Sequence, residues 1–189
     1  MTTRCVVEAG SPAELGISVI SRQAQRLDEI VREVLGMVSI DAGNLSAVRG
    51  EVSLHDGIAQ ALASTGATGV PVTGPDVTLR FNPGHLQQVL VNLLSNADKY
   101  AGGATGVRIE SSGGRVLLSV EDRGAGVPEE FRPHLFERLS RAERDAGSVR
   151  GTGLGLYIVR SLARANHGEV RHEPHPAGGS VFILDAEAV

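Results

Sequence analysis

The sequence has little of several residue types. Its 189 residues include no tryptophan, one cysteine and only 3% aromatic residues. With the single cysteine Cys5 the chain cannot form an internal disulfide, which is typical of a reducing compartment, and we expect a cytoplasmic protein. Because aromatic residues are scarce, we expect a core built from aliphatic side chains.

Long apolar runs and an excess of one charge are missing as well. No run approaches the roughly 20 residues of a membrane-spanning helix, and the first residues lack the apolar stretch of a signal peptide. The net charge of −4, without interleaved basic and aromatic residues, argues against a nucleic-acid partner. The content of 41% hydrophobic and 21% charged residues is that of an ordinary globular protein, long enough for one core and an additional helix.

The N-terminal part of the chain predicts one long amphipathic helix. Residues 11–14, Ser-Pro-Ala-Glu, are typical of a capping box with proline at the first helical position, and residues 41–44 supply a stop. Apolar residues between them recur at alternating steps of three and four: Ile17, Ile20, Ala24, Leu27, Val31, Val34 and Val38. This heptad pattern favours a helix that bundles with a partner; a helix packed on its own domain is the alternative.

The rest of the sequence predicts an α+β domain. Periodicity and turn residues predict strands at 50–54, 77–81, 107–110, 115–121, 168–172 and 180–185. The same signals predict helices at 54–63, 83–101, 129–136 and 153–166. Because hairpins and helices segregate instead of alternating, we expect a mixed sheet with helices on one face.

The predicted helix 83–101 combines a buried face with a polar border. Asn82 can cap it, and its apolar arc comprises Leu86, Val89, Leu90, Leu93, Leu94, Ala97 and Tyr100. Asn92, Asn96 and Lys99 lie along one stripe at the border of that arc. Asparagine is a poor interior helix residue, so two amides followed by an ammonium indicate binding of magnesium and phosphate. A solvated helix flank is the alternative.

Two glycine-rich motifs follow. Residues 122–126, Asp-Arg-Gly-Ala-Gly, come directly after a predicted strand, where a carboxylate can accept a hydrogen bond from an exocyclic amine and glycines admit a flat ring. Residues 151–156, Gly-Thr-Gly-Leu-Gly-Leu, open a predicted helix, and backbone amides at a helix N-terminus favour phosphate. A plain turn and an ordinary helix-entry loop are the alternatives.

The segment between these motifs is long and basic. Its roughly 25 residues, with Arg138, Arg141, Arg144 and Arg150, are typical of a functional lid, because compact domains rarely contain such long loops. The arginines could close over a triphosphate; a solvated basic loop is the alternative.

Taken in order, with Phe136-Glu137-Arg138 inside the lid, these motifs resemble the N, G1, F and G2 boxes of sensor histidine kinases of two-component systems. The resemblance runs from about Val77 to the C-terminus, and the helix ending at residues 40–43 resembles the second helix of the family's dimerisation domain. It implies the Bergerat ATP-binding fold of the GHKL superfamily, an α+β two-layer sandwich, here with a long N-terminal helix. Residues 1–49 would be a partial dimerisation helix, and residues 50–189 the ATP-binding catalytic domain.

The resemblance also implies the ligands ATP and Mg²⁺ and the residues that hold the metal and the phosphates. Asn96 would bind magnesium with help from Asn92, and Lys99 would contact phosphate. Arg141 would reach the terminal phosphates, so that Asn96, Lys99 and Arg141 form the catalytic set. The phosphates would be wrapped by Gly151, Thr152, Gly153, Leu154, Gly155 and Leu156.

Four further residues would form the adenine pocket by the same resemblance. Tyr100 would lie against the adenine, and Asp122 would hold its amino group. Gly124 and Gly126 would shape the pocket. The sequence departs from the family in the lid, where Leu139 and Ser140 stand at positions that are often aromatic.

A second departure concerns the phosphoacceptor. The family's acceptor is a histidine on the first dimerisation helix, followed by an acidic residue and Arg-Thr-Pro or similar, whereas no histidine precedes His55 and that first helix is missing. His172-Glu173-Pro174 is superficially similar but is not on a predicted helix. No spacing among the six histidines suggests a zinc site.

We therefore expect the catalytic part of a two-component histidine kinase, which transfers the γ-phosphoryl group of Mg-ATP to a histidine on a separate polypeptide. A response regulator would act downstream, and the N-terminal helix would form a dimer or bundle. A GHKL serine kinase or ATPase, and a non-catalytic nucleotide-binding module, are the alternatives. Those kinases and ATPases have a glutamate where Asn92 stands, and an amide cannot take a proton at neutral pH, which favours histidine phosphorylation and slow ATP hydrolysis.

Overall fold

In a computed structural model of the protein, residues 47–140 and 152–189 are described, with seven isolated helical positions before them: Gln23, Leu27, Val31, Val34, Gly36, Val38 and Ile40. Most of the predicted N-terminal helix and the lid segment 141–151 lie outside the described residues. Two predicted phosphate contacts, Arg141 and Gly151, fall in that segment.

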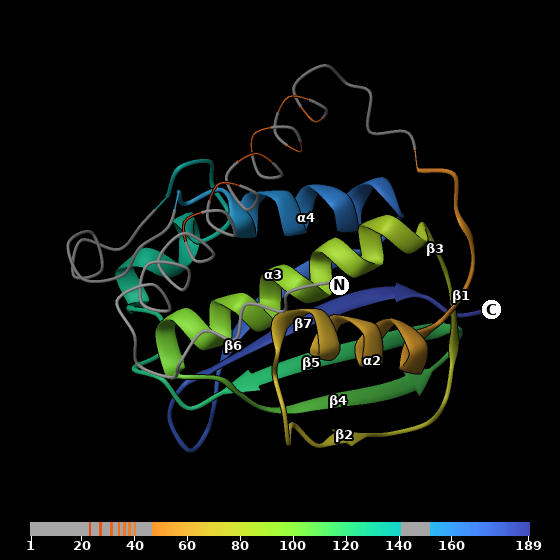
Figure 1. The fold of residues 1–189 in the computed structure, drawn as a ribbon, viewed down its shortest axis with the longest axis horizontal. Helices are drawn as coiled ribbons and strands as arrows, with labels where there is room; N and C mark the ends of the chain where they lie inside the picture. Colours follow the sequence, from red (N-terminus) through yellow and green to blue (C-terminus); the bar gives the residue numbers. More distant parts are fainter. Residues whose placement is uncertain are drawn as a thin grey trace, which may run out of the picture.

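One layer of the molecule is a mixed sheet of five strands (Figure 1). In spatial order they are β2 (Val72–Thr73), β4 (Ala104–Ser112), β5 (Arg115–Asp122), β7 (Ser180–Glu187) and β6 (Glu169–Pro174). β2 pairs in parallel with β4, and the other neighbours are antiparallel. A separate antiparallel pair joins β1 (Gly50–Ser53) to β3 (Thr78–Phe81).

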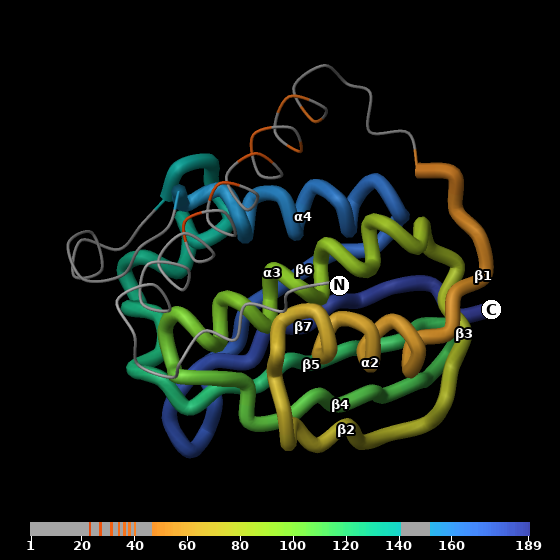
Figure 2. The backbone as a smooth tube through the Cα atoms, in the orientation of Figure 1, coloured from red at the N-terminus to blue at the C-terminus, as the bar shows by residue number. Residues whose placement is uncertain are grey.

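The second layer consists of helices on one face of that sheet (Figures 1 and 2). The α-helices of the described chain are α2 (Leu54–Thr65), α3 (Pro83–Ala101) and α4 (Gly155–Ala165), and a short 3₁₀ helix, η1, spans Glu129–His134. α3 lies between α2 and α4 and contacts both. This arrangement confirms the predicted two-layer α+β fold.

The ends of α3 follow directly from the sequence. The Asn82 side chain accepts a hydrogen bond from the His85 amide at 3.0 Å, and Gly102 ends the helix in the left-handed conformation. The predicted apolar arc is buried as far as Ala97. Tyr100 is 41% exposed, so the prediction that it joins the core is wrong: the last turn of α3 borders the loop after β5 instead.

The core is aliphatic, as the composition predicts. Phe81 and Phe182 are the aromatic residues in the buried core of the described chain, and the others are leucine, isoleucine, valine and alanine. Side chains of this kind cover the contact between the helices and the sheet. None of the described helices combines the length and apolar character needed to span a membrane.

A buried asparagine fixes α4 against α3. The Asn166 amide oxygen accepts a hydrogen bond from the Asn82 backbone at 2.7 Å, and its nitrogen donates to His85 Nδ1 at 2.9 Å and to the Leu162 carbonyl at 2.7 Å. Although His85 stands in the first turn of a helix, partial burial and this contact hold its ring in place.

The same contact sets the alignment of the two helices. The start of α3 meets the end of α4, so the helices run antiparallel (Figure 2). At 1.5 Å per residue, α4 extends about 16 Å back along α3. It therefore begins level with about Asn92.

Some element boundaries differ from the prediction. α4 begins at Gly155 instead of Gly153, because Gly153 has a φ of +74°, which is incompatible with a right-handed helix. β4 begins at Ala104 instead of Val107, and the two-residue strand β2 is not among the predicted strands.

The described positions of the N-terminal helix include exposed apolar side chains. Leu27, Val31, Val34 and Val38 are between 41% and 64% exposed, and all four belong to the predicted heptad stripe. At Gly36 an added Cβ would meet Gln88 and Ile158 at 3.5 and 3.6 Å, so this turn of the helix passes close to α3 and α4.

Candidate functional site

The amides of α3 lie beside the core. Asn92 and Asn96 are half-buried, and Lys99 one turn further on is exposed. The Asn92 side-chain nitrogen is buried and has no hydrogen-bond partner among the described residues. Buried polar atoms are normally satisfied, so such an atom marks a place where water or a ligand supplies the partner.

Asp122 ends β5 and is only 5% exposed. Its Oδ1 accepts two backbone hydrogen bonds, from the Gly124 amide at 2.9 Å and from the Ser180 amide at 3.1 Å. No described residue donates a hydrogen bond to Oδ2. The carboxylate is therefore held in one orientation by Oδ1, and Oδ2 remains an acceptor for another molecule.

The loop after β5 packs directly on the last turn of α3. A Cβ added to Gly124 would lie 2.7 Å from the Tyr100 carbonyl oxygen and 2.9 Å from the Ala101 Cβ, so only glycine fits without displacing the backbone. Asp122 and Tyr100, which belong to different motifs, are thereby brought to one end of the helical layer.

The turn between β6 and β7 closes the other side of Asp122. Gly179 has a φ of +101°, and a Cβ there would lie 2.1 Å from the Asp122 carbonyl oxygen. The same turn presents the Ser180 amide to Asp122. The sequence interpretation missed both residues: the Gly178-Gly179 pair signals a tight turn, but no local signal connects it with a strand that ends 58 residues earlier.

The entry to α4 offers backbone donors. Thr152 Oγ1 accepts a hydrogen bond from the Leu154 amide at 3.2 Å, and no side chain caps the first turn. The amides of that turn have no partner within the helix, so they and the helix dipole favour an anion. Because α4 begins level with about Asn92, these donors lie alongside the part of α3 that carries the amides.

The described start of the lid is anchored on α4. The Arg160 guanidinium lies 5.4 Å from the centroid of the Phe136 ring, a cation–π contact. Leu139, one of the residues that departs from the family pattern, is 61% exposed with a φ of +57°. The lid therefore leaves the core shortly after Phe136.

One histidine lies close to Asp122. His172, on β6, packs its ring 5.2 Å from that of Phe182, and its Nε2 is buried with no partner among the described residues. Burial and the charge of Arg132 lower the pKa of His172, while Asp122 and Glu173 act in the opposite direction. Its position in a strand agrees with the sequence interpretation.

The arrangement fits a nucleotide with its metal. Amide oxygens such as those of Asn92 and Asn96 suit magnesium, which takes few protein ligands and shares phosphate oxygens. The Asn92 nitrogen, which has no partner among the described residues, lies on the middle of α3, about level with the first turn of α4, and the loop that binds Asp122 lies beside the last turn of α3. The residues present therefore suit a base, a phosphate chain and a hard cation.

Comparison with known proteins places the chain among similar ATPases and histidine kinases. Residues 81–188 match the family described as "Histidine kinase-, DNA gyrase B-, and HSP90-like ATPase". The chain is 35% identical over 127 residues to the sensor histidine kinase component HK1 of Mycobacterium tuberculosis, covering 67% of this chain and 74% of the relative. It is 30% identical over 173 residues to the signal transduction histidine-protein kinase AfsQ2 of Streptomyces coelicolor. That match covers 90% of this chain but only 32% of AfsQ2.

A solved structure shows the same fold. The ATP-binding domain of PrrB from Mycobacterium tuberculosis superposes with a TM-score of 0.58 at 28% sequence identity. The match covers 75% of this chain and 98% of that domain.

Proposed function

Because the chain belongs to the histidine kinase-, DNA gyrase B- and HSP90-like ATPase family, we propose that residues 50–189 bind Mg-ATP and transfer its γ-phosphoryl group to a histidine on a separate polypeptide. Residues 1–49 would form a helix of the dimerisation and phosphotransfer domain. A response regulator would receive the phosphoryl group afterwards. The observation that carries the proposal is the buried Asp122 beside the amide-bearing helix α3: two amides fix its Oδ1, and no described residue donates to its Oδ2.

The end of α3 and the loop after β5 would recognise the nucleotide base. Asp122 Oδ2 would accept the hydrogen bond of the exocyclic amine of adenine. Gly124 and Gly126 would shape the pocket by letting the loop approach the last turn of α3 and the Gly179 backbone closely, and Tyr100 would lie against the ring. The relative PrrB is described as an ATP-binding domain, which supports the choice of nucleotide.

The polar stripe of α3 (Asn92, Asn96 and Lys99) and the residues that precede α4 would bind the phosphates and the metal. Asn96, with Asn92, would hold magnesium by amide oxygens, while Lys99 and Arg141 would neutralise phosphate charge. Backbone amides from Gly151 to Leu156 would wrap the phosphates. The bound Mg-ATP supplies the transferable phosphoryl group, and the residues of the chain contribute positioning and charge neutralisation.

A histidine acceptor suits this site better than a hydroxyl or water. A neutral imidazole already carries a lone pair, so no strong base is needed, and Asn92 cannot act as one. The histidines of the chain all lie between 55 and 175, and four of them have defined partners there: His55 with Asp76, His85 with Asn166, His134 with Glu137 and His175 with Glu121.

A bundle partner is supported by the N-terminal helix. Its exposed apolar positions, such as Leu27 and Val31, form a stripe that another helix could cover. A polypeptide that provides the acceptor histidine on such a helix would bring it to the ATP site.

The test is a phosphotransfer reaction in trans. The chain is mixed with ATP labelled at the γ-position and with candidate histidine-bearing proteins, and we expect an acid-labile, alkali-stable phosphoprotein on one of them. The Asn96→Ala chain serves as the control and should give no transfer.

Two outcomes would favour the alternatives. Rapid ATP hydrolysis by the chain alone, abolished by Asn92→Ala, would indicate an ATPase or serine kinase of the same superfamily. Failure to bind ATP would indicate a non-catalytic module.

A further inference from the structure

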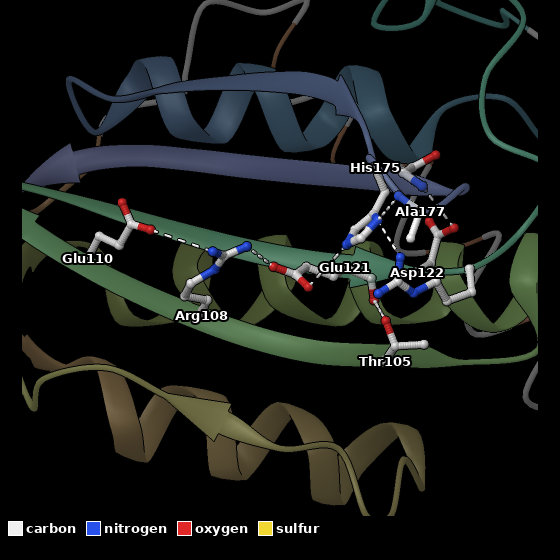
Figure 3. A network of polar contacts seen from close by, with 9 residues as sticks. Thr105, Arg108, Glu110, Glu121, Asp122, His175 and Ala177 are labelled. Atoms are coloured by element: carbon white, nitrogen blue, oxygen red, sulfur yellow. Dashed lines mark hydrogen bonds and ion pairs between the residues drawn. The ribbon is translucent and has the colours of Figure 1, made fainter.

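A polar network crosses the sheet beside Asp122 (Figure 3). Because successive side chains of a strand point to opposite faces, Asp122 points to the helix layer, whereas Glu121 points to the other face of the sheet. The network on that face connects Glu121 with Arg108 on β4 and with His175 in the turn between β6 and β7.

His175 is the centre of this network. Its side chain is 11% exposed, and its Nε2 lies 3.6 Å from Glu121 Oε2. Its Nδ1 accepts a hydrogen bond from the Ala177 amide at 3.0 Å and also contacts the Arg123 guanidinium. Both partners of Nδ1 are donors, so Nδ1 carries the lone pair and the ring proton sits on Nε2, facing the Glu121 carboxylate.

The turn that His175 organises is the one that holds Asp122. The His175 amide donates to the Gly179 carbonyl at 3.1 Å, and the Gly178 amide donates to the His175 carbonyl at 2.9 Å. This closed turn places Gly179 against the Asp122 carbonyl and directs the Ser180 amide to Asp122 Oδ1. His175 thus connects the turn to Glu121 and Arg123, the chain neighbours of Asp122 on either side.

The network is itself fixed to the sheet. Glu121 contacts the Arg108 guanidinium, and the Thr105 hydroxyl donates to the Glu121 carbonyl at 3.3 Å. Arg108 also lies 3.9 Å from Glu110 on the same strand. The Glu121 side chain is only 16% exposed, so its carboxylate is partly shielded from water, whereas its partner Arg108 is 50% exposed.

We propose that His175 is a positioning residue for recognition of the nucleotide base, acting through the Ser180 amide on the orientation of Asp122. This inference rests on the proposed function of the site. The direction of Asp122 Oδ2 is set by the two amides that bind Oδ1, and one of them comes from the turn that His175 ties to β5. Loss of the His175 contacts lets the Ser180 amide move and allows the carboxylate to rotate.

The experiment compares ATP with purine riboside triphosphate, which lacks the exocyclic amine, by calorimetric titration of the full chain. The ratio of the two affinities measures how much the hydrogen bond from the exocyclic amine to Asp122 contributes to binding. In the wild-type chain we expect ATP to bind more tightly. His175→Ala should weaken ATP binding about tenfold, the value of one charged hydrogen bond, and leave the analogue almost unchanged.

Two matched variants separate positioning from folding. In His175→Asn the amide oxygen takes the place of Nδ1, so it can accept the Ala177 hydrogen bond and keep the contact with Arg123, the chain neighbour of Asp122, and we expect most of the ratio to be retained. In His175→Gln the amide group reaches the position of Nε2, and the acceptor near the Ala177 amide is lost. We therefore expect the same ratio of ATP to analogue affinity as in His175→Ala. His55→Ala, which removes the contact of Nδ1 with Asp76 at the start of α2, is the control and should keep the wild-type ratio.

The outcomes distinguish the inference from the proposed function. If the wild-type chain binds ATP but His175→Ala weakens both ligands equally, or alters only the melting temperature, the positioning role is overturned and the proposed function stands. Equal ratios in the asparagine and glutamine variants would overturn it as well. If the wild-type chain binds neither ligand, the proposed function fails and this inference fails with it.

Discussion

At the scale of single residues, Asp122 is the most informative position. Asp122→Asn keeps an oxygen that can accept the Gly124 and Ser180 amides but turns a donor toward the base, where an acceptor is needed. We expect ATP affinity to fall about 30-fold with little change in stability. Calorimetric titration with ATP and thermal unfolding measure the two effects.

The matched control for this variant is Asp98→Asn, on an exposed side chain of α3. It should bind ATP like the wild-type chain. Unchanged affinity in Asp122→Asn would mean that the base is bound elsewhere.

Neighbouring glycines in the β6–β7 turn give a second prediction. Gly178 and Gly179 both have positive φ angles, but an added Cβ meets nothing within 4 Å at Gly178 and lies 2.1 Å from the Asp122 carbonyl at Gly179. We expect Gly178→Ala to cost about 1 kcal/mol of unfolding free energy through backbone strain alone. Gly179→Ala should cost about 3 kcal/mol, because the backbone must also move.

Urea unfolding of the two variants measures this difference. Nucleotide titration adds a second measurement, since displacement of Asp122 should weaken ATP binding only in the Gly179 variant. Equal destabilisation by the two substitutions would contradict the close contact between the turn and β5.

At the scale of elements, the junction of α3 and α4 predicts a pH dependence. Burial lowers the pKa of His85 and of His172 below the ordinary histidine value of about 6.5. The unfolded chain therefore binds more protons than the folded chain just below pH 6.5, so the stabilisation is complete above that pH and is lost as the pH falls. For His85 the reason is direct, because protonation of Nδ1 removes the acceptor of the Asn166 hydrogen bond.

Urea unfolding between pH 8 and pH 5 measures this effect. We expect the free energy of unfolding to decline below about pH 6.5, and the decline to be smaller in His85→Gln, which has no titrating group at this position. A free energy that rises toward pH 5, or an equal slope in the variant, would exclude His85 as a source.

The sequence predicts the structure correctly where the signals come from neighbouring residues. The bounds of α3 follow from Asn82 and Gly102, because a side-chain cap and a left-handed glycine act on the adjacent turn. The strand before Asp122 and the loop after it were predicted for the same reason, since alternation and glycines are properties of neighbouring residues.

The sequence does not predict the contacts that join segments far apart in the chain. The Ser180 amide reaches Asp122 across 58 positions, and Asn166 reaches Asn82 across 84. Serine and asparagine are ordinary residues at these positions in the sequence. Their hydrogen-bond partners come close only after the sheet has formed. The same limit applies to His85, because its partner Asn166 comes from the far end of α4.

At the scale of the whole molecule, the N-terminal helix predicts association. Val31 is 52% exposed within the predicted heptad stripe, and a lysine there would place a charge in any helical interface. We expect Val31→Lys to reduce self-association or binding of a partner helix, measured by light scattering after gel filtration. ATP affinity should not change, since the nucleotide site lies on residues beyond 90.

The control is a substitution outside the stripe, Gln23→Lys, which should associate like the wild-type chain. If the wild-type chain and Val31→Lys behave identically in the presence of histidine-bearing partners, the stripe is not an interface.

The central claim is that one nucleotide and its metal are held between α3, Asp122 and the entry to α4. The most direct measurement is calorimetric titration of the chain with ATP, with and without Mg²⁺, for the wild-type chain and Asn96→Ala. We expect one ATP per chain, bound more tightly with magnesium, and we expect Asn96→Ala to lose that gain while still binding metal-free ATP. No binding, or an equal magnesium effect in both chains, would contradict the account.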